Sequence, residues 1–171
     1  MNIAIVGGGI VGLAIGCKLQ SNRQYNIDLY EKEKQLGFHQ SGRNSGVIHS
    51  GLYYKPDSFR AKNCVNGRKQ LIQFAKENNI KYDICGKIVL AVTNQEATQL
   101  EHLKLNGEQN GLVDLKILTP QEFKKIEPNA EGIAALSVPQ SGIIDYKEVC
   151  NKFAKLIKQM NPNSKIALNC E

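Results

Sequence analysis

The chain has 171 residues, of which 42% are hydrophobic and 22% are charged. This length suits one domain or two small ones, and the balance is ordinary for a globular protein. The formal net charge is +6, which is compatible with anionic ligands or simply with a solvated lysine-rich surface. The lysines are scattered without an interleaved aromatic stripe, so nucleic-acid binding is not supported. No apolar run approaches the roughly 20 residues of a membrane helix.

The five cysteines are widely spaced, odd in number and never in a CxxC arrangement. This pattern argues against a disulfide framework and against a zinc site. The N-terminus is apolar at once and lacks the basic region of a secretory signal. We therefore expect reduced thiols, no bound metal and a cytoplasmic location. Peripheral contact with the inner face of a membrane is left open.

The first thirty residues have the pattern of a βαβ unit. A short apolar strand is expected at Asn2–Val6, followed by a glycine-rich turn at Gly7–Gly12. A helix with small residues on one face is expected at Val11–Ser21, and a second strand at Asn26–Tyr30. The order strand, turn, helix and strand at this length is typical of a dinucleotide-binding unit.

The turn contains the GxGxxG pattern at Gly7, Gly9 and Gly12. These glycines allow a tight turn, close approach of a pyrophosphate, and close packing of helix on strand. An acidic residue, Glu31, follows the second strand, where a carboxylate accepts hydrogen bonds from ribose hydroxyls. NAD and FAD both fit this unit, whereas the acid disfavours NADP. The position of the motif and the long loop that follows it favour FAD over NAD.

Later elements alternate between helices and strands. The glycine- and serine-rich stretch Leu36–Pro56 is too apolar for disorder, so we interpret it as a buried functional loop. A capping box at Thr93–Glu96 begins one helix, and Thr119 precedes another whose first residue is proline. The remaining expected elements are helices at Ser58–Asn78, Gln95–Asn110, Pro120–Ile126 and Tyr146–Met160, and strands at Lys87–Val92, Leu115–Leu118, Ala134–Val138 and Lys165–Leu168.

This order predicts an α/β fold: a Rossmann-type βαβ unit followed by the beginning of an α+β substrate domain. We expect the nucleotide-binding portion at 1–82, a partial substrate domain at 83–145, and a helix and strand that return toward the first portion at 146–171. The chain then stops just after its last expected strand, so the fold looks truncated.

Several segments together resemble a known family. The opening GGGIVGLA, the acidic strand end YEKE and the loop HQSGRNSGVIHSGLYY are similar to FAD-dependent oxidoreductases of the D-amino-acid oxidase superfamily. Within that group the chain most resembles the L-2-hydroxyglutarate oxidases and dehydrogenases. The resemblance continues through CGKIVLAV, TPQEFKKIEPN and PQSGIIDY, and so covers essentially the whole chain.

The resemblance implies a site as well as a fold. It implies FAD as cofactor, a small 2-hydroxyacid as substrate, and His49 as a catalytic residue near the flavin ring. Family members are substantially longer, so a second chain that completes the fold is a further implied partner. The implied cofactor-binding residues are Gly7, Gly9, Ile10, Gly12, Glu31, Lys32, Ser41, Arg43, Asn44, Ser45 and Gly46.

The residue types suit the oxidation of a 2-hydroxyacid, which removes a hydroxyl proton and passes a hydride from Cα to flavin. A neutral imidazole at His49 suits the first task, because its ordinary pKa of about 6.5 lies near working pH. His49 could equally be a hydrogen-bonded structural residue. Tyr53 and Tyr54 either line the substrate pocket or pack the loop. Lys87 and Arg60 could bind a carboxylate, although a surface charge is the simpler interpretation of each.

Three functions stay open at this point. The leading hypothesis is part of an FAD-dependent enzyme that oxidises L-2-hydroxyglutarate to 2-oxoglutarate. The second is a non-catalytic remnant or nucleotide-binding module that retains the fold alone. The third is a related flavin enzyme that acts on an amino acid or on glycerol 3-phosphate.

Overall fold

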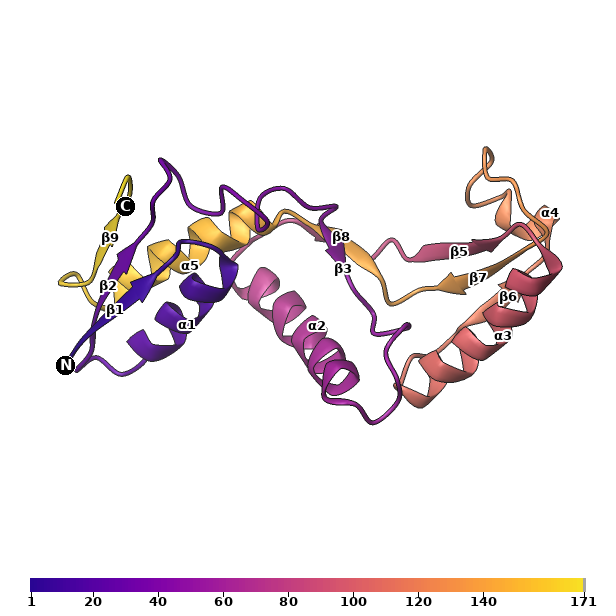
Figure 1. Cartoon of the computed structure of the whole chain (residues 1–171), viewed down its shortest axis with the longest axis horizontal. Coiled ribbons are helices and arrows are strands. Elements are labelled where there is room, and N and C mark those ends of the chain that lie inside the picture. Colours follow the sequence, from indigo (N-terminus) through magenta and orange to yellow (C-terminus); the bar gives the residue numbers. More distant parts are fainter. Residues whose placement is uncertain (171) are drawn as a thin grey trace. The chain divides into compact units, whose positions relative to one another are not determined.

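A computed structural model of the chain describes residues 1–170. The chain forms two compact units (Figure 1). The first unit consists of residues 1–46, 78–81 and 145–170, and the second of residues 47–77 and 82–144. The first unit is therefore built from segments that lie far apart in the sequence.

The first unit contains a parallel sheet. Strand β1 (Asn2–Val6) pairs with β2 (Asn26–Tyr30), and β2 pairs with β9 (Lys165–Ala167), which gives the order β1-β2-β9. The register places Ile3 opposite Ile27 and Leu29 opposite Ile166. Because parallel strands need a crossover, helix α1 (Ile10–Gln20) connects β1 to β2.

Helix α5 (Tyr146–Met160) packs beside α1 in this unit (Figure 1). Its buried residues follow helical spacing, with Val149, Cys150, Ala154 and Ile157 on one face. Asp145 caps the helix by accepting hydrogen bonds from the N–H groups of residues 147 and 148. The core of the unit joins this face to the sheet through Leu13, Ile27, Leu29, Cys150, Ala154 and Ile157.

A buried polar network ties α1, β2 and the segment before β9 together within the first unit. The Ser164 hydroxyl donates to Gln20 Oε1 at 2.5 Å and accepts from the Ile27 N–H at 2.8 Å. Gln20 Nε2 donates to the Tyr25 carbonyl at 2.8 Å. Because each buried polar atom in this set has a partner, the network fixes α1, β2 and the segment before β9 in one arrangement.

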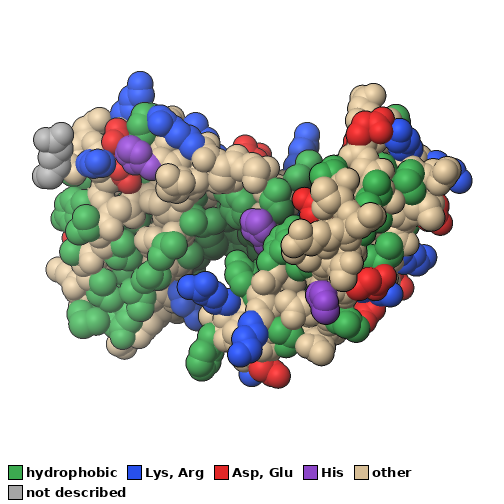
Figure 2. Space-filling view, turned by 45° about the vertical axis from the view of Figure 1, so that its right-hand side comes forward, with side chains coloured by type: hydrophobic (Ala, Val, Ile, Leu, Met, Phe, Trp, Pro, Cys, Tyr) green, Lys and Arg blue, Asp and Glu red, His purple; other side chains and the backbone are tan. Residues whose placement is uncertain are grey.

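One side of the first unit remains exposed and apolar. Strand β1 pairs with β2 and with no other strand of the described residues. Val6 is 89% exposed, Val11 69% and Ile15 50%. Figure 2 shows hydrophobic side chains gathered on the surface of this unit. An uncovered sheet edge beside exposed apolar side chains is typical of a surface that other polypeptide covers.

The second unit contains two antiparallel sheets. One has the order β3-β8-β4, formed by β3 (Val47–Ile48), β8 (Gly142–Ile144) and β4 (Tyr82–Asp83). The other has the order β5-β7-β6, formed by β5 (Lys87–Ala91), β7 (Ala134–Val138) and β6 (Lys116–Leu118). Its helices are α2 (Phe59–Glu77), α3 (Asn94–Gln109) and α4 (Pro120–Phe123).

Helix α3 covers the β5-β7-β6 sheet (Figure 1). It begins at the predicted capping box: the Thr93 side chain accepts from the Glu96 N–H, and the Glu96 carboxylate accepts from the Val92 and Thr93 N–H groups. Those backbone donors lower the pKa of Glu96. The core beneath α3 consists of Leu52, Ala91, Leu100, Leu112, Leu115, Leu136 and Val138.

The structure confirms the predicted α/β class and the predicted long elements within a residue or two at most ends. It shortens the predicted helix at 120–126 to Pro120–Phe123. It adds β3, β4 and β8, of which β3 lies inside the stretch predicted as a loop. These strands have two or three residues each, too few to show a periodic pattern.

The two units differ in their bounds from the predicted ranges 1–82, 83–145 and 146–171, mainly because 47–77 groups with the second unit. The predicted ranges stay a prediction about the complete protein. Among residues 1–170, no helix is both long and apolar enough to cross a membrane.

Candidate functional site

The glycine-rich turn joins β1 to α1, and its glycines differ in what they allow. Gly7 has φ +106°, a conformation that side-chain-bearing residues rarely adopt, and an added Cβ there would meet nothing within 4 Å. Gly9 is the extended residue before α1. At Gly12 a Cβ would collide with the Gly7 carbonyl oxygen. The turn is therefore tight on the Gly12 side and open at Gly7.

The N-terminus of α1 has free hydrogen-bond donors. The Ile10 N–H donates to the Ser41 hydroxyl oxygen at 2.9 Å. Within the described residues the Val11 and Gly12 N–H groups have no acceptor, as expected for the first turn of a helix. No acidic residue lies in this turn. Two free N–H groups at the positive end of a helix suit a phosphate group.

Glu31 lies directly after β2 and is 7% exposed. Its Oε2 accepts from the Gly8 N–H at 2.6 Å, and its Oε1 accepts from the Glu33 N–H at 2.9 Å. The carboxylate therefore holds the glycine-rich turn against the end of β2. Each carboxylate oxygen has a second lone pair, so Glu31 can still accept hydrogen bonds from ribose hydroxyls.

The other predicted binding residues of the first unit lie on the loop after Glu31, and their contacts are with nearby residues. Asn44 stabilises its own loop, donating to the Gln40 and Ser41 carbonyls at 2.9 Å and accepting from the Gly46 N–H at 2.8 Å. Arg43 lies over the Phe38 ring, 4.4 Å from its centroid.

Lys32 is exposed, with its Nζ 4.0 Å from Glu33 Oε1, and Ser45 is exposed as well. The structure thus brings Gly7, Gly9, Ile10, Gly12, Glu31 and Ser41 together around the turn. It places Lys32 and Arg43 in contacts with neighbouring side chains. The binding roles of all these residues stay predictions.

Cys150 lies beneath the loop that carries Ser41. A Cβ at Gly37 would lie 3.4 Å from the Cys150 Sγ. Burial raises the pKa of Cys150 to about 11, with a smaller lowering by the Ser41 hydroxyl. The thiol is therefore protonated near neutral pH and acts as a packing group beneath the loop rather than as a nucleophile.

His49 belongs to the second unit and directly follows β3. Its side chain is exposed, and its carbonyl oxygen accepts from the Cys64 thiol at 3.5 Å. It lines a cavity of about 110 Å³, which we call the His49 pocket. The residues around this pocket are His49, Ser50, Gly51, Leu52, Tyr53, Tyr54 and Lys87.

The loop that forms the His49 pocket is held from beneath by α3. Leu52 is fully buried in the core of the second unit. Asn110, at the end of α3, donates to the Gly51 carbonyl at 3.0 Å and to the Tyr54 carbonyl at 2.8 Å. Asn110 is not among the residues that the sequence pattern indicates. Its position just after a helix is a signal only for a C-cap, and not for a contact more than fifty residues away.

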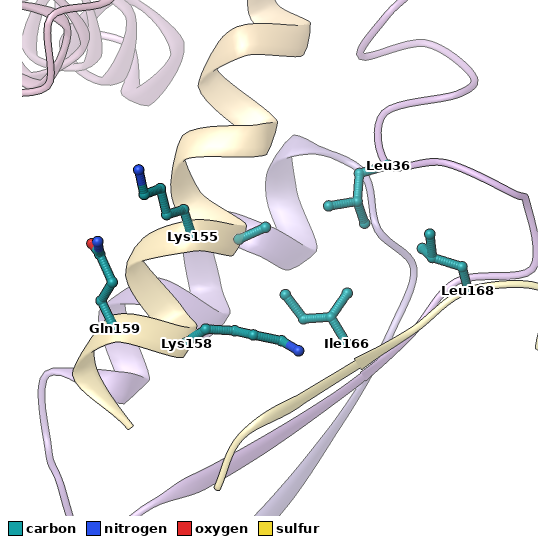
Figure 3. Close-up of a pocket in the computed structure, with 7 residues that line it drawn as sticks. Leu36, Lys155, Lys158, Gln159, Ile166 and Leu168 are labelled. Carbon is teal, nitrogen blue, oxygen red and sulfur yellow. The ribbon is translucent and has the colours of Figure 1, made fainter. Parts of the chain in front are cut away.

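A larger hollow of about 480 Å³ lies between α5 and β9 (Figure 3). Leu36, Ile166 and Leu168 surround it, while Lys155 and Gln159 lie along α5. None of the predicted site residues lines it. Among residues 1–170, no three His, Cys, Asp or Glu side chains gather in a way that could hold a metal ion.

The chain has relatives among known enzymes. It is 48% identical over 154 residues to an L-2-hydroxyglutarate dehydrogenase of Indibacter alkaliphilus, covering 90% of this chain and 39% of that protein. It is 44% identical over 155 residues to the mitochondrial L-2-hydroxyglutarate dehydrogenase of Homo sapiens, covering 90% of this chain and 34% of that one. The chain therefore spans little more than a third of the length of these relatives.

Solved structures show the same fold. The FAD-bound L-α-glycerophosphate oxidase of Mycoplasma pneumoniae superimposes with a TM-score of 0.88 at 29% identity, over 99% of this chain and 45% of that one. Glycine oxidase of Geobacillus kaustophilus superimposes with a TM-score of 0.86 at 23% identity, over 98% and 46%. The family described as FAD dependent oxidoreductase matches residues 2–169. The chain belongs to this family of FAD-dependent oxidoreductases.

Proposed function

We propose that this chain forms part of an FAD-dependent enzyme that oxidises L-2-hydroxyglutarate to 2-oxoglutarate. The observation that carries the proposal is its 48% identity, over 90% of the chain, to an L-2-hydroxyglutarate dehydrogenase. The geometry of the glycine-rich turn supports the cofactor. Val11 and Gly12 offer free N–H groups beside an open Gly7, and Glu31 keeps free lone pairs for a ribose.

In this proposal the first unit holds the dinucleotide. The turn and the N-terminus of α1 bind the pyrophosphate, and Glu31 binds the adenosine ribose. Ser41, Asn44, Ser45 and Gly46 follow along the cofactor, with Ile10, Lys32 and Arg43 as further contacts. Bound FAD would supply the hydride acceptor, which no side chain of a protein can replace.

The second unit supplies His49 as the base. Its imidazole nitrogen takes the proton of the substrate hydroxyl while the hydride leaves Cα. His49 is exposed and lines a pocket, so a substrate can reach it. His49 thereby becomes an imidazolium, and it returns its proton to water after the keto product departs.

The proposal is tested by anaerobic flavin reduction in the complete protein that contains this chain. L-2-Hydroxyglutarate should bleach the flavin, and His49→Ala should slow that step by roughly 10²–10⁴-fold while flavin stays bound. His102→Ala, an exposed histidine on α3, is the matched control and should change nothing. A His49→Ala rate within a few-fold of the parent rate would place the base elsewhere, and loss of flavin would make His49 a structural residue.

A second candidate is oxidation of glycerol 3-phosphate, favoured by the superposition with L-α-glycerophosphate oxidase. Glycerol 3-phosphate and amino acids therefore belong in the same anaerobic assay. Bleaching by one of these, without bleaching by L-2-hydroxyglutarate, would replace the proposed substrate. A protein that purifies without flavin, and takes none up, would be a non-catalytic member of the family.

The exposed edge of β1, together with the exposed side chains of Val6 on β1 and of Val11 and Ile15 on α1, supports a further proposal about partners. Additional polypeptide, from a longer version of this chain or from a second chain, covers that edge and completes the sheet. The cytoplasmic location and any peripheral membrane contact stay predictions from the sequence.

A further inference from the structure

Lys87 is a cation without a carboxylate partner in the second unit. It lies on β5 and is half-buried. Its Nζ is 3.3 Å from the Tyr53 hydroxyl and 4.4 Å from the centroid of the Tyr53 ring. No Asp or Glu of the described residues lies within ion-pair distance of it. An ammonium group has three N–H donors, so two remain for a ligand.

The His49 pocket adds a second polar group that has no partner. Ser50 is 2% exposed, and its hydroxyl makes no hydrogen bond within the described residues. Buried polar atoms in native proteins are nearly always paired, so an unpaired one needs an explanation. Ser50 and Lys87 line the same pocket, together with His49.

The His49 pocket has the size and the donors for a small anionic group. Its volume of about 110 Å³ gives room for a carboxylate with its neighbouring carbons. The side chains around it offer donors: the ammonium of Lys87 and the hydroxyls of Ser50 and Tyr53. A small group with several acceptor oxygens and a negative charge matches them.

The walls of the pocket are held in place without a ligand. Leu52 is fully buried, and Asn110 holds the carbonyls of Gly51 and Tyr54. Lys87 is fixed on a strand that pairs with β7 along its length. A pocket whose donors are already positioned loses little entropy on binding, which favours specific recognition.

We propose that the His49 pocket binds a carboxylate of the substrate, with the Lys87 ammonium as its counter-ion and the hydroxyls of Ser50 and Tyr53 as further donors. This inference rests on the proposed function for the class of substrate, a 2-hydroxydicarboxylate. Such a substrate has two carboxylates, one beside the hydroxyl and one at the far end. The pocket holds one of these carboxylates, so Lys87 determines the specificity of the site for a carboxylate-bearing substrate.

The first test is binding of glutarate to the complete protein, measured by titration calorimetry. Lys87→Met should weaken the binding of glutarate at least ten-fold, because the carboxylate loses a hydrogen-bonded partner of opposite charge. Lys87→Arg keeps the charge and should recover most of that loss. Lys116→Met, an exposed lysine on the same sheet, is the matched control and should bind as the parent does. Unchanged binding in Lys87→Met, or stronger binding of inorganic phosphate than of glutarate by the parent, would overturn the proposal.

The second test compares L-2-hydroxyglutarate with L-2-hydroxypentanoate, which lacks the far carboxylate. Lys87→Met should raise KM with little change in kcat. A rise for L-2-hydroxyglutarate alone assigns the pocket to the far carboxylate, and a rise for both substrates assigns it to the carboxylate beside the hydroxyl. A rise for neither contradicts the proposal. If neither substrate reduces the parent flavin, the proposed function fails, while the glutarate titration still tests the pocket.

Discussion

The glycine-rich turn of the first unit and the His49 pocket of the second unit are built in opposite ways. The turn offers backbone N–H groups and empty space, and the Glu31 carboxylate after β2 accepts hydrogen bonds that hold it in place. The pocket offers side-chain groups from Ser50, Tyr53 and Lys87 on a backbone that other residues hold. The first site is therefore sensitive to added atoms, and the second to removed ones.

The largest effect that sharpens this comparison is expected at Gly12. Gly12→Val places a Cβ against the Gly7 carbonyl oxygen, which belongs to the backbone and cannot rotate away. We expect a loss of about 3 kcal/mol or more in the free energy of unfolding, at the upper end of overpacking effects. Denaturant unfolding measures it.

Two other glycines serve as controls for Gly12. Gly9→Val meets only the Ser41 hydroxyl, at 3.3 Å from the Cβ, so the protein should fold yet purify without flavin. Gly67→Ala, in α2 with nothing within 4 Å, should raise stability by about 0.5–1 kcal/mol. Full flavin content in Gly9→Val would contradict the assignment of the turn to a pyrophosphate.

A smaller effect is expected at Glu31. Glu31→Gln replaces one carboxylate oxygen, which accepts a hydrogen bond, with an amide NH2 group, which donates one. That NH2 group then faces the backbone N–H of Gly8 or of Glu33. We expect a loss of about 1–3 kcal/mol in stability and a roughly ten-fold weaker FAD affinity in the complete enzyme. Glu33→Gln, on the same segment and more exposed, is the control. FAD affinity unchanged in Glu31→Gln would remove Glu31 from the ribose site.

The smallest effect is expected at Asn110, which tests how the pocket is held. Asn110→Ala removes two hydrogen bonds, to the Gly51 and Tyr54 carbonyls. We expect about 1–2 kcal/mol of lost stability and faster amide hydrogen exchange in the loop at 49–54. Asn106→Ala, which loses one longer bond of 3.3 Å to Tyr54, should cost less. Equal exchange rates in the two variants would show that the Asn110 bond to the Gly51 carbonyl does not hold the loop.

The same contrast explains what the sequence predicts and what it does not. The turn at Gly7–Gly12 and the capping box at Thr93–Glu96 are local, so their spacing predicts them. The contact of Lys87 with Tyr53 joins residues 34 positions apart, and that of Asn110 with Gly51 joins residues 59 apart. Such contacts depend on the packing of β5 and α3, which no periodic pattern encodes. The sequence alone therefore indicates a surface charge at Lys87, and only the fold shows its contact with Tyr53.

The discontinuous first unit has a consequence for the order of folding during synthesis. Its sheet needs β9, and its core needs α5. Along the chain, 115 residues lie between β2 and α5, and 134 lie between β2 and β9. The second unit has all its strands and its own core once residue 144 has emerged from the ribosome. Because distant pairings form late, the second unit can fold while β1, α1 and β2 still wait for their partners. The N-terminal segment, with β1, α1 and β2, is thus synthesised first but completes its packing last. Its apolar strands stay exposed during that interval, when they are prone to aggregation.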